Sequence, residues 1–254
     1  MTHEISTHVE DGILTISFNR LDRKNSITTA MYAAMADALS RADSDPSLRV
    51  AVLQGHDSVF TAGNDLGDFL KGAPEGDSPV FRFLHAIAQF SKPLLAAVCG
   101  PAIGVGTTML FHCDLVYAGD NAVFSIPFVN LGLCPEAASS LLAPQAFGYH
   151  RAAEALLFGE QISAHRAFEF GLVNKILPAS EVNAYAQSQA RKLAAKPISS
   201  LLEIKRLMKK GQQAAVSQQM ADESASFRRM VGQPAAREAF IAFMEKRKPD
   251  FSKV

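Results

Sequence analysis

The first forty residues carry two different periods of hydrophobic and polar positions. Residues 5–9 and 13–18 alternate apolar with polar side chains, and between them stands an Asp-Gly dipeptide, which strongly favours a tight hairpin turn. From residue 28 onward, after two threonines that can cap a helix, apolar side chains recur every three or four positions as far as about Ala42. The sequence therefore predicts a β-hairpin followed by an amphipathic helix.

Short apolar runs then alternate with helical patterns. Residues 50–53, 94–98 and 115–117 are continuous apolar runs, as is typical of buried strands. Helical patterns at about 79–90 and from about 105 separate them. Strands that alternate with covering helices predict an α/β fold.

The last quarter of the chain has a helical pattern. Strand signals cease at about residue 180, and amphipathic patterns follow at residues 182–195, 198–210, 214–230 and 235–247. We expect two parts, an α/β body of residues 1–199 and a helical tail of residues 200–254. Within the body, a stretch with Pro, Gly and Asp at residues 72–78 is predicted to form a mobile loop.

The composition is that of an ordinary globular protein, and its charge is balanced. Hydrophobic residues make up 48% and charged residues 20% of the chain, which argues against a disordered protein. The 25 Lys and Arg balance the 25 Asp and Glu, so no overall field attracts nucleic acid or an anionic membrane. An anionic ligand would have to be held by local groups.

The sequence offers no targeting or metal-binding pattern. The N-terminus lacks the apolar core of a signal peptide, and no apolar run approaches the roughly 20 residues that span a bilayer. Residues 252–254 end in the wrong residue for a peroxisomal tripeptide. The three cysteines and the histidines have no metal-ligand spacing. We expect a cytoplasmic protein with reduced thiols and no metal.

Two glycine-containing stretches stand where a strand is expected to lead into a helix. They are FTAGNDL at residues 60–66 and GPAIGVGTT at residues 100–108. Glycine lets the backbone approach a ligand, and the first turn of a helix has unsatisfied N–H groups, so two such donors could form an oxyanion hole. The alternative is a pair of tight turns with close packing. The second stretch is not a dinucleotide fingerprint, because its glycines run G-x-x-x-G-x-G.

Four segments, in order and spread over nearly the whole chain, resemble motifs of the enoyl-CoA hydratase/isomerase (crotonase) family. FNR at residues 18–20 with NS at 25–26 resembles N-R-P-x-x-x-N-A, although leucine replaces the proline. Residues 60–66 resemble F-[ST]-A-G-x-D-[LI]. Residues 92–106 resemble K-P-x-x-A-x-x-x-G-x-[AC]-x-G-[GA]-G, and residues 239–251 resemble A-F-x-x-F-x-E-K-R-x-P-x-F.

The resemblance implies the ClpP/crotonase fold, an α/β spiral of ββα units with a C-terminal helical region that builds a trimer or a dimer of trimers. It also implies an acyl-CoA thioester as substrate, without a further cofactor because the CoA is part of that substrate. The tail agrees with an oligomer, since it carries more apolar side chains than a lone appendage would leave exposed. These side chains include Leu201, Leu202, Ile204, Leu207, Phe240 and Phe243.

Carried over residue by residue, the family pattern assigns the two oxyanion N–H groups to Asn64 and Val105. Many members have glycine at the second position, and a valine there keeps the N–H but narrows the pocket. The pattern also assigns residues that border the bent CoA, namely Lys24, Ser26, Ala62, Asp65 and Leu66. Phe227 and Lys246 are expected to approach its adenine and phosphates from a neighbouring subunit.

The acidic residues decide which reaction is expected. Thr108 and Phe128 stand where hydratase-type members carry their two glutamates. CPEAASS at residues 134–140 resembles the P-E-G-x-S-S segment of Δ3,Δ2-enoyl-CoA isomerases, and the GNDL form of the first oxyanion stretch is also theirs. The resemblance therefore predicts isomerisation of 3-enoyl-CoA to trans-2-enoyl-CoA, as in fatty-acid β-oxidation, with Glu136 moving the proton.

Moving a double bond asks for fewer groups than adding water to one. Hydration needs one group to activate the water and another to protonate carbon 2, whereas a single carboxylate can take a proton from carbon 2 and return it to carbon 4. Glu136 stands among apolar neighbours, which are expected to raise its pKa. Asp65 is expected to have a structural role, such as capping the next helix, rather than to act as a second base.

Three alternatives stay open at the level of sequence. Glu136 follows a proline and precedes a helical pattern, so it could serve only to complement a helix dipole. Family membership alone would also permit enoyl-CoA hydration or the reaction of another acyl-CoA lyase of the crotonase family. A third alternative is an acyl-CoA-binding protein that has kept the fold and lost the chemistry.

Overall fold

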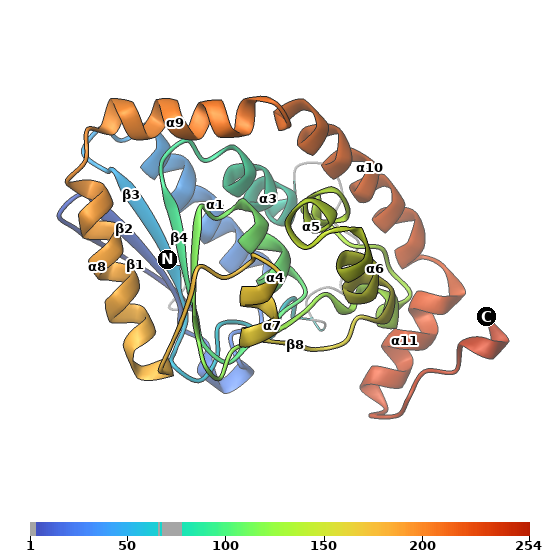
Figure 1. The fold of residues 1–254 in the computed structure, drawn as a ribbon. Coiled ribbons are helices and arrows are strands. Elements are labelled where there is room, and N and C mark those ends of the chain that lie inside the picture. The colour runs from blue at the N-terminus through green and yellow to red at the C-terminus, as the bar shows by residue number, and fades with distance from the viewer. Residues whose placement is uncertain (1–3, 66, 68–77) are drawn as a thin grey trace.

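The computed structural model describes residues 4–65, 67 and 78–254, and within them a six-stranded sheet forms the centre of the molecule (Figure 1). Its strands, in spatial order, are β1 (Ile5–Glu10), β2 (Ile13–Phe18), β3 (Val50–Gln54), β4 (Leu94–Val98), β6 (Leu115–Gly119) and β9 (Lys175–Leu177). The first pair is antiparallel and the others are parallel. The predicted hairpin is confirmed, and Asp11 and Gly12 in its turn have positive φ angles of 50° and 75°.

Helices cover both faces of this sheet. On one face, α8 (Val182–Ala194) packs against Val50 and Val52 of β3. On the other, α1 (Thr29–Ser44) belongs to the same core cluster as the intervening Ala51. Alternate residues of a strand point to opposite faces. Because both faces are covered, β3 is a continuous apolar run rather than an alternating one.

The helix predicted from residue 28 begins at its predicted cap. Thr28 Oγ1 accepts a hydrogen bond from the Met31 amide at 3.3 Å, and the helix continues two residues beyond Ala42. The next long helix, α3 (Pro79–Gln89), packs alongside it. The loop predicted at residues 72–78 lies, apart from its last residue, outside the described part of the chain.

The sequence pattern does not predict a second, smaller sheet. Within the described residues it consists of β5 (Pro101–Ile103), β7 (Val123–Ser125) and β8 (Ile162–Ser163). These strands are two or three residues long, too short to show a period of two. The short helices of the body are α4 (Val105–Thr108), α5 (Ser139–Phe147), α6 (Tyr149–Phe158) and α7 (Ala164–Glu169). The 3-10 helices are η1 (Leu21–Arg23), η2 (Met109–His112), η3 (Pro127–Leu131), η4 (Ala179–Glu181) and η5 (Phe251–Lys253).

The helical tail packs onto the body and is not a separate appendage. It consists of α9 (Ile198–Lys210), α10 (Gln213–Val231) and α11 (Pro234–Met244). In Figure 1 these helices run over the top of the molecule and down one side, and α10 and α11 pack against α5 and η3. Phe227 and Phe240 of the tail join Phe128 and Leu133 of the body in one apolar cluster. The tail therefore supplies part of the interior of its own chain.

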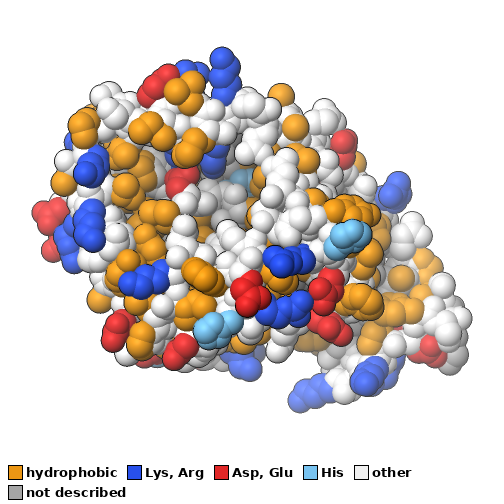
Figure 2. All heavy atoms as spheres, in the orientation of Figure 1, with side chains coloured by type: hydrophobic (Ala, Val, Ile, Leu, Met, Phe, Trp, Pro, Cys, Tyr) orange, Lys and Arg blue, Asp and Glu red, His pale blue; other side chains and the backbone are white. Residues whose placement is uncertain are grey.

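Part of the apolar surface of the tail stays exposed. Among the tail residues expected in a subunit contact, Phe240 is buried, whereas Ile204, Leu207 and Phe243 are 54%, 56% and 58% exposed. Figure 2 shows hydrophobic side chains interspersed with charges of both signs, and no continuous basic surface on the face drawn. Among the described residues, no helix combines the length and the hydropathy that crossing a bilayer requires.

Candidate active site

The two glycine-containing stretches lie side by side. The Thr61 amide donates to the carbonyl of Pro101 at 2.9 Å, and the Ile103 amide donates to the carbonyl of Thr61 at 3.0 Å. This short parallel pairing aligns residues 60–64 with β5, which leads directly into α4. The ends of both stretches, Asn64 and Val105, therefore line one cavity.

Two glycines make this close approach possible. Gly63 has a φ of +87°, and a Cβ built on it would lie 2.7 Å from the carbonyl oxygen of Ile103. Gly104, immediately before α4, has φ and ψ of 58° and −118°, a conformation that essentially only glycine adopts. Any larger residue at position 63 would push the two stretches apart.

The amides of Asn64 and Val105 have no acceptor among the described residues, although their neighbours do. The Gly63 amide donates to Thr61 Oγ1, and the Gly104 amide donates to the carbonyl of Ser125. Val105 is the first residue of α4, where a helix leaves its N–H groups unpaired. Two free donors at one cavity are the arrangement that an oxyanion hole requires.

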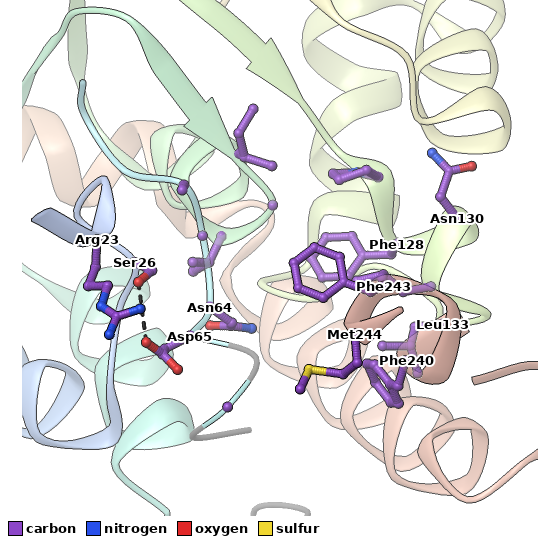
Figure 3. A pocket seen from close by; sticks show the side chains of 18 of the residues that line it. Arg23, Ser26, Asn64, Asp65, Phe128, Asn130, Leu133, Phe240, Phe243 and Met244 are labelled. Atoms are coloured by element: carbon purple, nitrogen blue, oxygen red, sulfur yellow. Dashed lines mark hydrogen bonds between the residues drawn. The ribbon is translucent and has the colours of Figure 1, made fainter. Parts of the chain in front are cut away.

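The cavity holds about 510 Å³ and has a polar and an apolar wall. Figure 3 shows Arg23, Ser26, Asn64 and Asp65 on one side, facing an apolar set on the other. The apolar set consists of Phe128, Leu133, Phe240, Phe243 and Met244. A ligand with a polar part and an apolar acyl chain fits such a cavity.

An ion pair stiffens the polar wall. Arg20 Nη1 donates to Asp65 Oδ2 at 2.7 Å and to Ser26 Oγ at 2.8 Å. Asn25, fully buried, accepts the Arg20 amide at 2.8 Å and donates to the carbonyl of Phe60 at 3.0 Å. The carboxylate of Asp65 is thus paired with a guanidinium, which supports the expected structural role. Its capping of the next helix concerns residues outside the described part.

Some of the residues expected to border a CoA line this cavity, and others do not. Ser26, Ala62 and Asp65 line it, and Leu66 lies outside the described residues. Lys24 and Lys246 are exposed and do not line it. Arg23 lines the cavity instead. The sequence does not distinguish it from the neighbouring Lys24, because only the direction of the backbone at this turn decides which side chain faces the cavity.

Phe227 lies at the cavity of its own chain. Its ring is buried and lies edge-on to Phe128, with ring centroids 6.3 Å apart. It belongs to the same apolar cluster as Phe240. Its expected approach to the adenine of a CoA bound to a neighbouring subunit stays a prediction.

Glu136 carries a buried carboxylate close to this cavity, although it does not line it. Its Oε1 accepts a hydrogen bond from Thr108, the last residue of α4, whereas Oε2 is buried and has no partner among the described residues. Burial raises the pKa of Glu136 to about 8, the Thr108 hydrogen bond lowers it in part, and the charge of Glu223 raises it further. This side chain can hold and release a proton near neutral pH.

Tyr32 of α1 contacts the first oxyanion stretch and is influenced by the charge of Glu136. Its hydroxyl donates to the side-chain oxygen of Asn64. Burial and the nearby charge of Glu136 raise the pKa of Tyr32 well above its usual value, so its proton stays in place. The sequence analysis missed this residue because it looks like one more apolar position of an amphipathic helix.

The turn that carries Glu136 is not the start of a helix. Ala137 and Ala138 have positive φ angles of 61° and 54°, and α5 begins only at Ser139. The acid at the N-terminus of α5 is Glu223 of α10, which accepts hydrogen bonds from the amides of Ala138 and Ser140 at 2.6 and 2.9 Å. Glu223, rather than Glu136, therefore accepts the free amides at the start of this helix.

No group of His, Cys, Asp or Glu side chains suited to a metal ion occurs in the part of the chain that the structure describes. The most buried histidine, His112, donates through Nε2 to the carbonyl of Ala137 at 2.7 Å. Burial lowers the pKa of His112 to about 4, so the ring is neutral at neutral pH. Its role is to hold the turn that carries Glu136.

Known proteins of this kind share both the sequence and the fold. Residues 8–253 match the family model described as enoyl-CoA hydratase/isomerase. The chain is 34% identical to 1,2-epoxyphenylacetyl-CoA isomerase of Escherichia coli K12, over 99% of each protein. It is 37% identical to enoyl-CoA delta isomerase 2 of Rattus norvegicus over 80% of this chain, which spans only 54% of that protein.

Solved structures agree with these relatives. OdaA of Pseudomonas aeruginosa superposes with a TM-score of 0.94 at 44% identity, covering 96% of this chain and 99% of that one. An enoyl-CoA hydratase/isomerase of Pseudoalteromonas atlantica T6c also gives 0.94, at 38% identity and 98% and 99% coverage. The chain belongs to the enoyl-CoA hydratase/isomerase family and has the crotonase fold.

Proposed function

We propose that this enzyme converts 3-enoyl-CoA to trans-2-enoyl-CoA in fatty-acid β-oxidation. The observation that carries the proposal is the hydrogen bond between Thr108 and Glu136. Thr108 stands where hydratase-type members carry a glutamate, so a single carboxylate, that of Glu136, is left to move a proton. That carboxylate is buried, and one of its oxygens has no partner among the residues that the structure describes. One proton carrier suits a double-bond shift better than the addition of water.

The reaction needs two backbone donors and one base. The N–H groups of Asn64 and Val105 bind the thioester oxygen, and ionised Glu136 takes a proton from carbon 2. The electron pair left on carbon 2 conjugates with the double bond between carbons 3 and 4, which gives a dienolate that the two donors stabilise. Glu136 then returns the proton to carbon 4, and the double bond lies between carbons 2 and 3. The CoA is part of the substrate, so no further cofactor takes part.

Enoyl-CoA hydration is the rival reaction. It requires a second acid/base residue, and the candidate positions carry Thr108 and Phe128. Phe128 is a buried ring packed against Phe227. A curated relative, 2,3-dehydroadipyl-CoA hydratase of Escherichia coli K12, is 30% identical, so the family relationship alone does not choose between the two reactions.

The two reactions separate when the two thioesters are supplied singly. With 3-enoyl-CoA we expect the conjugated 2-enoyl-CoA to accumulate, and with 2-enoyl-CoA we expect no 3-hydroxyacyl product. Chromatography of the thioesters measures both. Rapid formation of 3-hydroxyacyl-CoA from the conjugated substrate would replace the proposal by hydration, and no turnover of either substrate would favour a non-catalytic acyl-CoA binder.

The proposal includes a homo-trimer or a dimer of trimers. Its support is the set of half-exposed apolar residues of the tail, Ile204, Leu207 and Phe243, which an isolated chain leaves in water. Sedimentation equilibrium at micromolar concentration is expected to give a mass three or six times that of the chain. A single monomeric species would remove this part and leave the reaction untouched.

A further inference from the structure

A second buried carboxylate stands behind the first. Glu223, in the middle of α10, is 5% exposed. Its two oxygens accept three hydrogen bonds, from the amide of Ala138 at 2.6 Å, from the amide of Ser140 at 2.9 Å and from the Ser140 hydroxyl. A carboxylate so placed cannot serve as a solubilising surface group, so its partners indicate what it does.

Those partners belong to the turn that carries Glu136. Ala137 and Ala138 are both held at positive φ, which side-chain-bearing residues rarely adopt, and Ala137 stands where the resembling isomerase segment has glycine. Such a conformation persists only when its surroundings fix it. Glu223 binds this turn from the tail, and His112 binds it from η2.

We propose that Glu223 is the positioning residue of the active site: it fixes the turn that carries Glu136 through three hydrogen bonds and sets a second negative charge beside it. The inference deepens the proposed function and rests on it for the meaning of the Glu136 proton. It assigns to α10, a helix of the tail, a direct influence on the proton carrier.

The hydrogen-bond partners decide which carboxyl ionises first. Burial raises the pKa of Glu223, but the donors at Ser140 and Ala138 oppose that shift, whereas within the described part of the chain Glu136 has only the Thr108 hydroxyl. Glu223 therefore loses its proton first, and its charge then opposes the ionisation of Glu136. The two carboxyls thus lie in unlike surroundings, and the charge of Glu223 opposes the ionisation of Glu136, which exchanges the proton.

The other titratable groups around the turn leave this charge uncompensated. Tyr32 on α1 and Cys134 before the turn both have pKa values raised by burial, and His112 on η2 is neutral. Lys205 and Lys209 of α9 act on His112, and Arg229 of α10 acts on Cys134. Among the described residues, Glu223 is the charged group whose field acts on Glu136.

Two substitutions should move the pH dependence of kcat/KM in opposite directions. Glu223→Gln removes the charge and one accepted hydrogen bond, so the rising limb should shift to lower pH by about 0.5 to 1 unit, with a lower plateau because the turn is less well held. Thr108→Val removes the hydrogen bond that favours ionised Glu136, so its limb should shift to higher pH. A purely structural defect would lower the rate equally at every pH.

Gln219 provides the matched control. It lies one turn before Glu223 on the same helix and donates to the same Ser140 hydroxyl at 2.8 Å, but carries no charge. Gln219→Ala should leave the midpoint of the limb where it is. Glu223→Asp keeps the charge on a shorter side chain, so it should lower kcat with little change in the midpoint of the limb. It is also the variant to measure if Glu223→Gln does not fold.

A readout that does not use turnover separates this inference from the proposed function. The carboxylic C=O band of Glu136, taken as the infrared difference between the wild type and Glu136→Gln, is titrated with and without Glu223→Gln. A downward shift of the band midpoint supports the inference, and an unchanged midpoint overturns it. If the midpoint shifts but Glu136→Gln retains full activity, the proposed function fails while the role of Glu223 in the turn stands.

Discussion

Replacing Glu136 by glutamine should slow the isomerisation of 3-enoyl-CoA by about a hundredfold or more. Glutamine has the same shape and can still accept the hydrogen bond from Thr108, but it cannot take a proton from carbon 2. The loss should appear in kcat, since the donors of Asn64 and Val105 still bind the thioester. The rise in ultraviolet absorbance of the conjugated thioester measures the rate.

The thermal stability of Glu136→Gln provides the control that this variant is folded. The pKa of Glu136 is raised from its ordinary 4.5 to about 8 in the folded protein. The folded state therefore binds more protons than the unfolded state between these values, and wild-type stability falls as the pH rises through this window. Glu136→Gln has no such titration and should be at least as stable as the wild type at pH 8 in thermal unfolding. A folded variant with full activity would show that another group moves the proton.

Replacing Val105 by proline should lower kcat by about a hundredfold to a thousandfold, the usual effect of losing one oxyanion donor. Val105 is the first residue of α4, a position where proline fits a helix because its missing N–H is not part of the helical ladder. The substitution thus removes the proposed donor with little change to the backbone. Steady-state kinetics with 3-enoyl-CoA, alongside far-ultraviolet circular dichroism, measures the effect.

Val105→Ala is the matched variant. It keeps the N–H and removes only the two methyl groups, so its rate should stay within about tenfold of the wild type. The comparison of the two variants isolates the backbone donor from the shape of the pocket wall. Equal rates for the proline and alanine variants would mean that the Val105 amide takes no part in stabilising the dienolate.

The sequence predicts long and strongly periodic elements well. The predicted bounds of α9 agree with the structure, and the N-cap at Thr28 and the hairpin turn at Asp11 are where the local chemistry requires them. These features depend on nearest neighbours along the chain. β8, by contrast, has two residues, and only its pairing with β7 defines it as a strand.

The candidate site likewise has one part that the sequence predicts and another that only tertiary packing defines. Asn64 and Val105 are brought to one cavity as the family motifs imply, because glycines at fixed offsets control the backbone. Glu223 could not be predicted, since an acidic residue in an amphipathic helix usually faces water, and only tertiary packing turns it toward Ser140. The family is shown by the matches, whereas the choice of reaction depends on Thr108 and Glu136 and stays a prediction.

The cavity wall formed by α10 and α11 has a consequence for the order in which the active site is completed during folding. These helices follow the sheet in the chain, so the sheet and both glycine-containing stretches can pair before the tail docks. Until α10 docks, Ala137 and Ala138 lack the contacts that hold their unusual backbone, and the rings of Phe227 and Phe240 are missing from the cavity. The active site is therefore complete only when the tail has docked onto η3 and α5 in the middle of the chain.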